Sequence, residues 1–307
     1  MPQWSKHLKK WFPKIDLNTT KDEGKDMQLP VKGEAYRLNL LGMPKPIYDL
    51  SYDELLAVSA DIVEKGTIDG TCLIETTDFL LYWSWCAQLL RTKPSFWQPC
   101  GDLEDLMDLV MASVLAEPEK VACIHARRVA NAKWRVMAYL AFPLLEGILK
   151  MVCKEFVSKD GEVLKPFFSY KKGGQCSSVS DMLQLYVNDI ANEKPKNAIT
   201  SILFNIKEKD AKKRFGCQVL YSWRNDMLHG SDYHTVGATV LTLACIIAIS
   251  TIPDIERHRG NALLDSVSMS EFPQSDQVFV NYHFPHRKEL FTLLPSPIAV
   301  IKRLSGA

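Results

Sequence analysis

Apolar residues recur three and four positions apart through most of this chain, the spacing that places them on one face of an α-helix. Ser51 and Glu54 form a capping box that predicts a helix start, and Gly66 predicts its end. Pro143 should kink or divide the longest helical segment, and Pro195 should break the chain between two shorter ones. The remaining predicted helices span residues 73–90, 103–115, 119–156, 180–190, 198–206, 210–228 and 233–255.

The pattern changes after Gly260. Val278, Val280 and Tyr282 occupy every second position shortly before Pro285, which predicts a small C-terminal β-hairpin. The sequence therefore predicts a mostly α protein with a minor β appendage. Three regions are expected: a helical N-terminal region of unknown role at 1–118, a helical bundle at 119–258 and a C-terminal extension at 259–307.

The composition is that of a globular protein and limits what its charge can do. The chain has 307 residues, of which 47% are hydrophobic and 24% are charged. Its net charge is only +1, so any nucleic-acid surface must be a local patch. Eight cysteines occur without a Cys-x-x-Cys pair, and we see no signal peptide. We therefore expect a reduced, cytoplasmic protein with no disulfide framework and no zinc site.

The most apolar segment, residues 236–253, contains no charged residue and is nearly long enough to cross a bilayer. Thr239, Thr242 and Ser250 interrupt it, and His234 and Asp254 flank it closely. We interpret the segment as a buried core helix and expect no contact with a membrane.

The strongest chemical signal is Arg-Asn-Asp-Met-Leu-His-Gly at residues 224–230, where one helix pattern ends shortly before the next begins. A fixed cation and a group titrating near neutrality could bind a phosphodiester and move a proton during its cleavage. The same residue types are also common at helix C-termini for structural reasons alone. On a continuous helix Arg224 and His229 lie about 140° apart. A joint site therefore needs the helix to end near Gly230, a second copy of the chain, or both.

Arg224, Asn225 and His229 resemble the signature of the HEPN superfamily, which is an arginine, a polar residue, three or four variable residues and a histidine. The context is also similar, because the motif ends one helix and a long apolar helix follows. Upstream, Phe142-Pro143-Leu144-Leu145-Glu146 resembles the early HEPN helix whose acidic residue faces the arginine. The resemblance covers about residues 129–255 and is to HEPN domains of the abortive-infection type.

The resemblance implies a HEPN-like helical bundle that dimerises across its motif helices and cleaves RNA without a metal or cofactor, in prokaryotic defence or a toxin–antitoxin system. It implies that His229 is the general acid and base and that Arg224 stabilises the phosphorane. Asn225 would orient the pair, and Glu146 would bind Arg224. The implied partners are RNA, a second copy of the chain, and an antitoxin or other defence-system protein. Two alternatives stay open: a non-catalytic HEPN-like module that binds nucleic acid or a nucleotide, and a helical protein in which the motif is only a helix end.

Other candidates lie outside the motif. His234 could sit near the same cleft as His229, or it could cap the next helix. Lys171 and Lys172, near the tip of a predicted loop at 158–178, could contact phosphates, as could Lys212 and Lys213 in the basic cluster at 207–214. Otherwise these lysines belong to a solvated loop and a solvated helix face.

Overall fold

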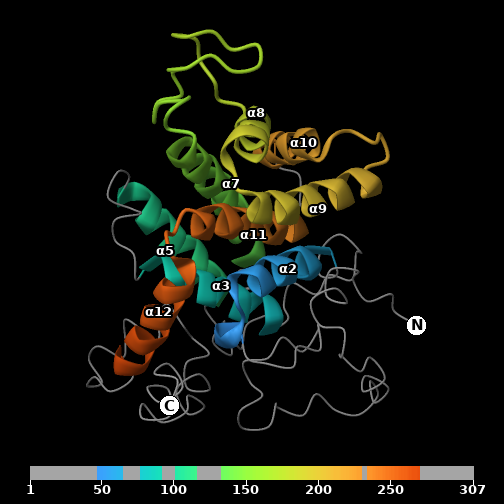
Figure 1. The fold of residues 1–307 in the computed structure, drawn as a ribbon. Helices are drawn as coiled ribbons and strands as arrows, with labels where there is room; N and C mark the ends of the chain where they lie inside the picture. The colour runs from blue at the N-terminus through green and yellow to red at the C-terminus, as the bar shows by residue number, and fades with distance from the viewer. Residues whose placement is uncertain (1–46, 65–76, 92–100, 116–132, 230–233, 270–307) are drawn as a thin grey trace.

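The computed structural model describes residues 47–64, 77–91, 101–115, 133–229 and 234–269, and the chain is mostly α-helical over these ranges, as predicted (Figure 1). Only isolated β-bridges occur among them, and all of these lie between residues 157 and 175. The predicted hairpin near Val278 lies outside the described residues, as do residues 1–46.

The elements follow one another as η3 (Ile47–Asp49), α2 (Tyr52–Val63), α3 (Thr77–Arg91), α5 (Gly101–Leu115), α7 (Lys133–Val152), α8 (Val179–Leu185), η6 (Tyr186–Ile190), α9 (Glu193–Lys209), α10 (Gly216–Leu228), α11 (His234–Ser250) and α12 (Ile255–Met269). The predicted capping box is present: Ser51 Oγ accepts the Glu54 N–H at 3.3 Å, and Glu54 Oε2 accepts the Ser51 N–H at 2.7 Å. This reciprocal pair of bonds explains why α2 begins at Tyr52.

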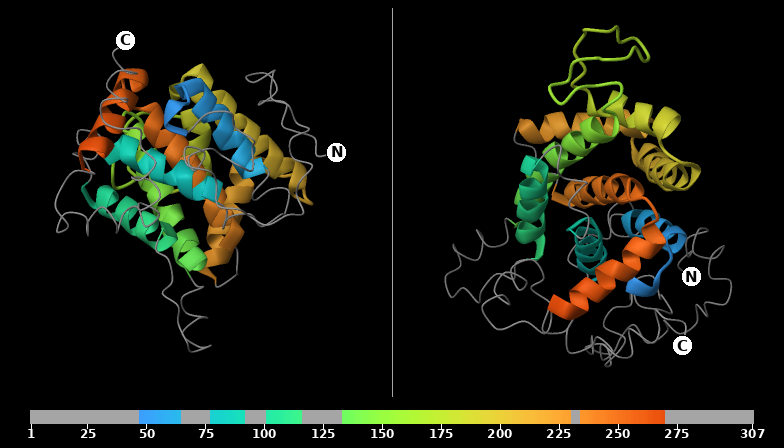
Figure 2. Two further views of the ribbon diagram at one scale, coloured as in Figure 1. Left: turned by 90° about the horizontal axis from the view of Figure 1, so that it is seen from below. Right: turned by 60° about the vertical axis from the view of Figure 1, so that its left-hand side comes forward.

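Helix α11 forms the centre of the core, between α7 on one side and α2 and α3 on the other (Figures 1 and 2). Its side chains from Val236 to Ile249 are buried, as expected for a core helix. A Cβ on Gly237 would lie 2.6 Å from the Cα of Ala138, so glycine allows α11 and α7 to pack closely. Within α11, Thr242 accepts a hydrogen bond from the indole N–H of Trp83 at 3.1 Å, which satisfies a polar group inside the core.

No single helix among the described residues is long and apolar enough to cross a membrane. Two helix segments, Val236–Ser250 of α11 and Ile255–Ala262 of α12, have the length and composition of a membrane span only when taken together. The angle between them at the break is 109°.

Two prolines interrupt the helices less than predicted. α7 continues through Pro143, whose ring is exposed and whose missing N–H removes one hydrogen bond from the helix. Pro195 does not break the chain but lies in the first turn of α9, which begins at Glu193. Backbone N–H groups in a first turn have no partner within the helix, so a proline is tolerated there.

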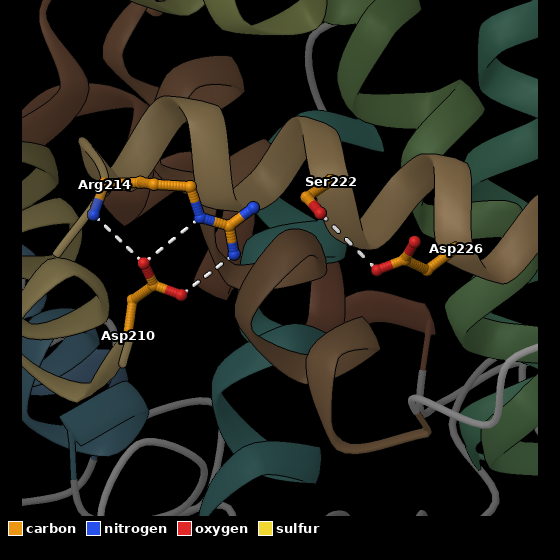
Figure 3. A network of polar contacts seen from close by, with 4 residues as sticks. All are labelled: Asp210, Arg214, Ser222 and Asp226. Carbon is orange, nitrogen blue, oxygen red and sulfur yellow. Dashed lines mark hydrogen bonds and ion pairs between the residues drawn. The ribbon is translucent and has the colours of Figure 1, made fainter. Parts of the chain in front are cut away.

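The helix predicted from residue 210 begins only at Gly216, and Asp210 explains the difference (Figure 3). Its carboxylate accepts hydrogen bonds from the Arg214 backbone N–H at 3.0 Å, from Nε at 3.1 Å and from Nη2 at 2.9 Å. This arrangement holds a turn between α9 and α10 in which Lys213 has a φ of +53°. Lys212 therefore lies in a turn and not on a helix face.

The last predicted core helix ends at Ser250 instead of residue 255, and the separate helix α12 follows it across the predicted limit at residue 259. The ring nitrogen Nε2 of His258 lies 2.6 Å from the Leu89 carbonyl oxygen, and Arg259 donates to the Leu50 carbonyl. Residues of α2, α3 and α5 belong to the same continuous core as residues of α7 to α11. Helices from both sides of residue 118 therefore pack together.

Candidate functional site

A cavity of about 460 Å³ opens between α5, α7, α10 and the chain that follows α7. Its apolar wall includes Leu103, Phe142, Met151 and Met227. Its charged side chains are Asp102, Glu146, Lys150, Lys154, Lys159 and Arg224, so four basic groups face two acidic ones. An apolar cavity with a few placed charges is the usual form of a binding site for a small molecule or part of a polymer.

Glu146 of α7 is the centre of the charged wall. Its Oε2 accepts a hydrogen bond from Nη2 of Arg224 at 3.2 Å, and its Oε1 lies 3.2 Å from Nζ of Lys150 one turn further along α7. The Glu146 side chain is 17% exposed and that of Arg224 is 28% exposed, so solvent only partly screens their interaction. The contact between Glu146 and Arg224 that the resemblance implies is therefore present.

The motif helix presents only part of its motif to this cavity. Arg224, Met227 and Leu228 line it from α10, whereas Asn225 and His229 are not among the described lining residues. This matches the angle of about 140° that a helix places between Arg224 and His229. α10 does end at the motif, because His229 is its C-cap and donates its backbone N–H to the Asn225 carbonyl at 3.1 Å. The His229 side chain is exposed, but this helix end does not bring it into the cavity.

Sequence reasoning missed three lysines of the cavity, and two of them had a detectable signal. Glu146, Lys150 and Lys154 follow one another at intervals of four residues, which places them on one side of a helix. Lys159 had no such signal, because it reaches the cavity only through the path of the loop after α7. Its partner there is Asp102 at 3.8 Å, and both side chains are largely exposed, so this ion pair is weak.

The other predicted residues lie away from the cavity. Lys212 and Lys213 are exposed in the turn before α10, whose first residue, Gly216, lies about 12 Å along the helix axis from Arg224. Nζ of Lys213 donates to the Glu208 carbonyl at 2.5 Å, so this ammonium group already has a partner within the turn. Lys171 and Lys172 are exposed in the loop before α8. His234 is the first residue of α11, and its side chain lies outside what the structure describes.

Asp226, a further charged residue of the motif, is not directed toward the cavity. Its Oδ2 accepts a hydrogen bond from the Ser222 hydroxyl at 3.4 Å, one turn earlier on α10 (Figure 3). Asp226 is absent from the described lining of the cavity, and this bond directs its carboxylate back along its own helix. It stands one residue beyond Asn225 in the sequence but shares no described contact with Arg224 or Glu146.

The described lining of the cavity contains neither a histidine nor a cysteine, the residue types most often used for proton transfer and nucleophilic attack near neutral pH. Burial raises the pKa of the neighbouring Cys153 thiol to about 12, and that of Cys217 to about 12 as well. Both thiols are therefore protonated at neutral pH and unsuited to act as nucleophiles. Among the described residues no group of three or more histidine, cysteine, aspartate or glutamate side chains is arranged to hold a metal ion.

Comparison of the chain with protein-family models, with curated proteins and with solved structures finds no match. The assignment of the motif therefore depends on its own residues and on the geometry around them. That geometry is an arginine held by a glutamate at the wall of a cation-rich cavity, with an exposed histidine at the end of the same helix.

Proposed function

We propose that the protein is a metal-independent endoribonuclease of HEPN type that acts as a dimer, with Arg224 and His229 in the chemistry. The observation that carries this proposal is the Arg224–Glu146 ion pair, which holds the motif arginine at the wall of the cavity. Attack of a ribose 2′-OH on the adjacent phosphate places extra negative charge on the phosphorus oxygens. A guanidinium fixed in advance stabilises that charge without reorganising during the reaction.

The guanidinium of Arg224 keeps hydrogen-bonding capacity for a phosphate. Its described bond to Glu146 uses Nη2 alone, and an arginine has five N–H donors. Lys154 is exposed at the cavity and has no ion pair among the described residues, so it suits a neighbouring phosphate. Glu146 acts here as a positioning residue, because it touches Arg224 and not the reacting atoms.

The proton transfers fall to His229, and a second copy of the chain supplies what one copy lacks. Leu228 is 66% exposed and Tyr139 is 45% exposed, and both line the cavity. Val136, one turn before Tyr139 on α7, is exposed as well. Clustered exposed apolar side chains are typical of an interaction surface. A second copy that covers them would bring its own motif helix, and with it a histidine, against this cavity.

The test is incubation of the full-length protein with mixed single-stranded RNA in excess EDTA, beside Arg224→Ala and His229→Ala. We expect cleavage to persist in the chelator and to be lost in both variants. Removing one general acid–base group typically costs about 10²- to 10⁴-fold in rate. Arg257→Ala, which removes an exposed arginine from α12, is the matched control and should cleave normally. Equal cleavage by the wild type and both motif variants would exclude these residues from the mechanism.

A second candidate function is binding of RNA or a nucleotide without cleavage. It is favoured by one observation: the cations line the cavity, but His229 is not among the described lining residues. In that case Arg224→Ala should weaken binding while His229→Ala binds as the wild type does. Fluorescence anisotropy with a labelled oligonucleotide measures both variants.

A further inference from the structure

Residues 158–178, which we call the projecting loop, extend away from the helical bundle between α7 and α8 (Figures 1 and 2). The loop is built from defined backbone contacts. The N–H of Val163 donates to the Gly174 carbonyl at 2.9 Å, and the N–H of Gly173 donates to the Val163 carbonyl at 2.8 Å. The N–H of Cys176 likewise donates to the Gly161 carbonyl at 2.8 Å. These bonds join the two sides of the loop.

Aromatic rings fix the loop to the end of α7 and the start of α8. Phe156 and Phe167 meet edge to face with centroids 6.2 Å apart, and Phe167 stacks on Tyr170 at 5.0 Å. The Tyr170 hydroxyl donates to Oδ2 of Asp181 in α8 at 2.6 Å. The inner side of the loop therefore has a continuous set of side-chain contacts.

Phe168 lies at the outer end of this arrangement, where its ring meets Phe167 edge to face with centroids 5.6 Å apart. Its side chain is 55% exposed, although the adjacent Phe167 is buried. Its φ is +47°, in the left-handed region where a bulky side chain is a rare and strained exception. Such a conformation persists only where the surrounding structure imposes it, and it is found most often at functional sites. The loop thus keeps a large apolar ring largely exposed to solvent, although both its exposure and its backbone conformation are unfavourable.

The residues around Phe168 are basic. From residue 164 to residue 172 the chain contains Lys165, Lys171 and Lys172 and no acidic residue, and these lysines are exposed. The acidic residues of the projecting loop, Asp160 and Glu162, precede this segment. Exposed Leu164 adds a second apolar side chain to the same segment.

The basic segment is linked to the cavity by one side-chain contact and by short stretches of sequence. Nζ of Lys165 lies 4.6 Å from the centroid of the Phe156 ring, and Phe156 is two residues beyond Lys154, which lines the cavity. Lys159, near the start of the projecting loop, lines the cavity too. Basic side chains therefore occur both at the cavity and in the segment around Phe168.

We propose that the projecting loop binds single-stranded RNA, with one base stacked on Phe168 and the phosphates beside it contacted by Lys171 and Lys172. The strand then passes Lys159 and Lys154 into the cavity. This inference rests on the proposed function for the identity of the polymer. An aromatic ring among lysines is the combination that single-stranded nucleic acids require, because every base offers a flat face for stacking. In a duplex the bases are stacked on one another and offer no such face.

The experiment uses the full-length protein with His229→Ala, so that RNA is not cut, and a fluorescein-labelled oligouridylate of about 12 nucleotides. Phe168→Asn should lower its affinity by about 5-fold to 150-fold, because it removes the stacking ring. Asparagine tolerates the left-handed backbone, so this variant should unfold at the same temperature as its parent or higher. Phe168→Tyr, which keeps a ring, should bind like the parent.

The lysines are tested by the salt dependence of the same binding. Replacing both Lys171 and Lys172 by glutamine should reduce the slope of log affinity against log salt by about 1.4, because two phosphate contacts are lost from a single strand. The matched control replaces Lys194 of α9 and Arg257 of α12, two exposed cations outside the loop and the cavity, by glutamine and should leave the slope unchanged. An equal loss in both double variants would mean a general effect of charge and would overturn the inference.

Three further outcomes separate this inference from the proposed function. Binding that depends on Phe168, in a protein whose wild type does not cleave RNA in EDTA, supports the loop and refutes the nuclease. Normal cleavage by Phe168→Asn with an unchanged KM would support the nuclease and overturn the role of the loop. Binding to vesicles of phosphatidylcholine and phosphatidylserine that depends on Phe168, without binding to RNA, would assign the loop to a membrane surface and overturn the inference.

Discussion

Replacing Glu146 by glutamine should move protein stability and RNA binding in opposite directions. The substitution keeps the size of the side chain and removes the charge that two cations share, Arg224 at 3.2 Å and Lys150 at 3.2 Å. At 3.2 Å and an effective dielectric of about 20, one such pair is attracted by about 5 kcal/mol before desolvation is counted. Desolvation and the remaining exposure reduce this, so we expect a net loss of about 1–3 kcal/mol in the free energy of unfolding. Urea denaturation measures it.

The same substitution should strengthen binding of an anion in the cavity. The charged groups that line it change from four basic and two acidic to four basic and one acidic. Removing one nearby negative charge should lower the free energy of RNA binding by about 1 kcal/mol, which is about fivefold in affinity. Cleavage should nevertheless fall, because a neutral amide oxygen holds Arg224 less firmly than the carboxylate does. Tighter binding with slower cleavage is the signature that distinguishes a positioning residue from a simple repulsive charge.

Two controls make this prediction decisive. Lys154→Gln removes an exposed cation from the turn after α7 and should weaken RNA binding without a measurable change in stability. A double-mutant cycle with Glu146→Gln and Arg224→Gln should give a coupling energy of about 1–2 kcal/mol in unfolding. If Glu146→Gln weakens RNA binding in parallel with cleavage, the cavity does not bind RNA as argued, and a coupling energy near zero would refute the ion pair.

Three further predictions concern other parts of the fold. Gly237→Ala should lower the free energy of unfolding by about 1–3 kcal/mol, because its Cβ would lie 2.6 Å from the Cα of Ala138; an unchanged urea midpoint would contradict the close packing of α7 and α11. Hydrogen bonds from Arg214 lower the pKa of Asp210 from 3.8 to about 2, so its stabilisation is present above about pH 4 and is lost as the pH falls toward 2. Asp210→Asn should remove that part of the pH dependence of the urea midpoint. Since burial raises the pKa of Cys153 to about 12, iodoacetamide should modify Cys153 only after unfolding, as mass spectrometry of native and denatured samples will show.

The sequence predicted those features that depend on neighbouring residues. The start of α2 followed from Ser51 and Glu54, whose mutual hydrogen bonds form within one turn. The buried position of α11 followed from its long apolar segment without a charged residue. The contact of Glu146 with Arg224 joins residues 78 positions apart, and a family resemblance was needed to predict it.

Features that depend on distant parts of the chain were not predicted. Lys159 reaches the cavity only because the chain that follows α7 passes close to Asp102 of α5, and the sequence has no local sign of that path. The late start of α10 depends on a carboxylate that competes with helix formation by bonding backbone and side chain of Arg214. The face on which His229 lies depends on how α10 ends, and helix ends are the part of a helix that sequence patterns define least well.

The burial of α11 on every side has a practical consequence for anyone who wishes to isolate the motif-bearing bundle. Trp83 of α3 closes over Thr242, and side chains of α2 cover the same helix. A chain shortened to begin at residue 119 would present this apolar surface to water and leave the Thr242 hydroxyl without its indole partner. Such a fragment should aggregate instead of folding, so any loss of RNA cleavage in it would say nothing about Arg224 or His229. Single substitutions in the full-length chain are the appropriate route to the site.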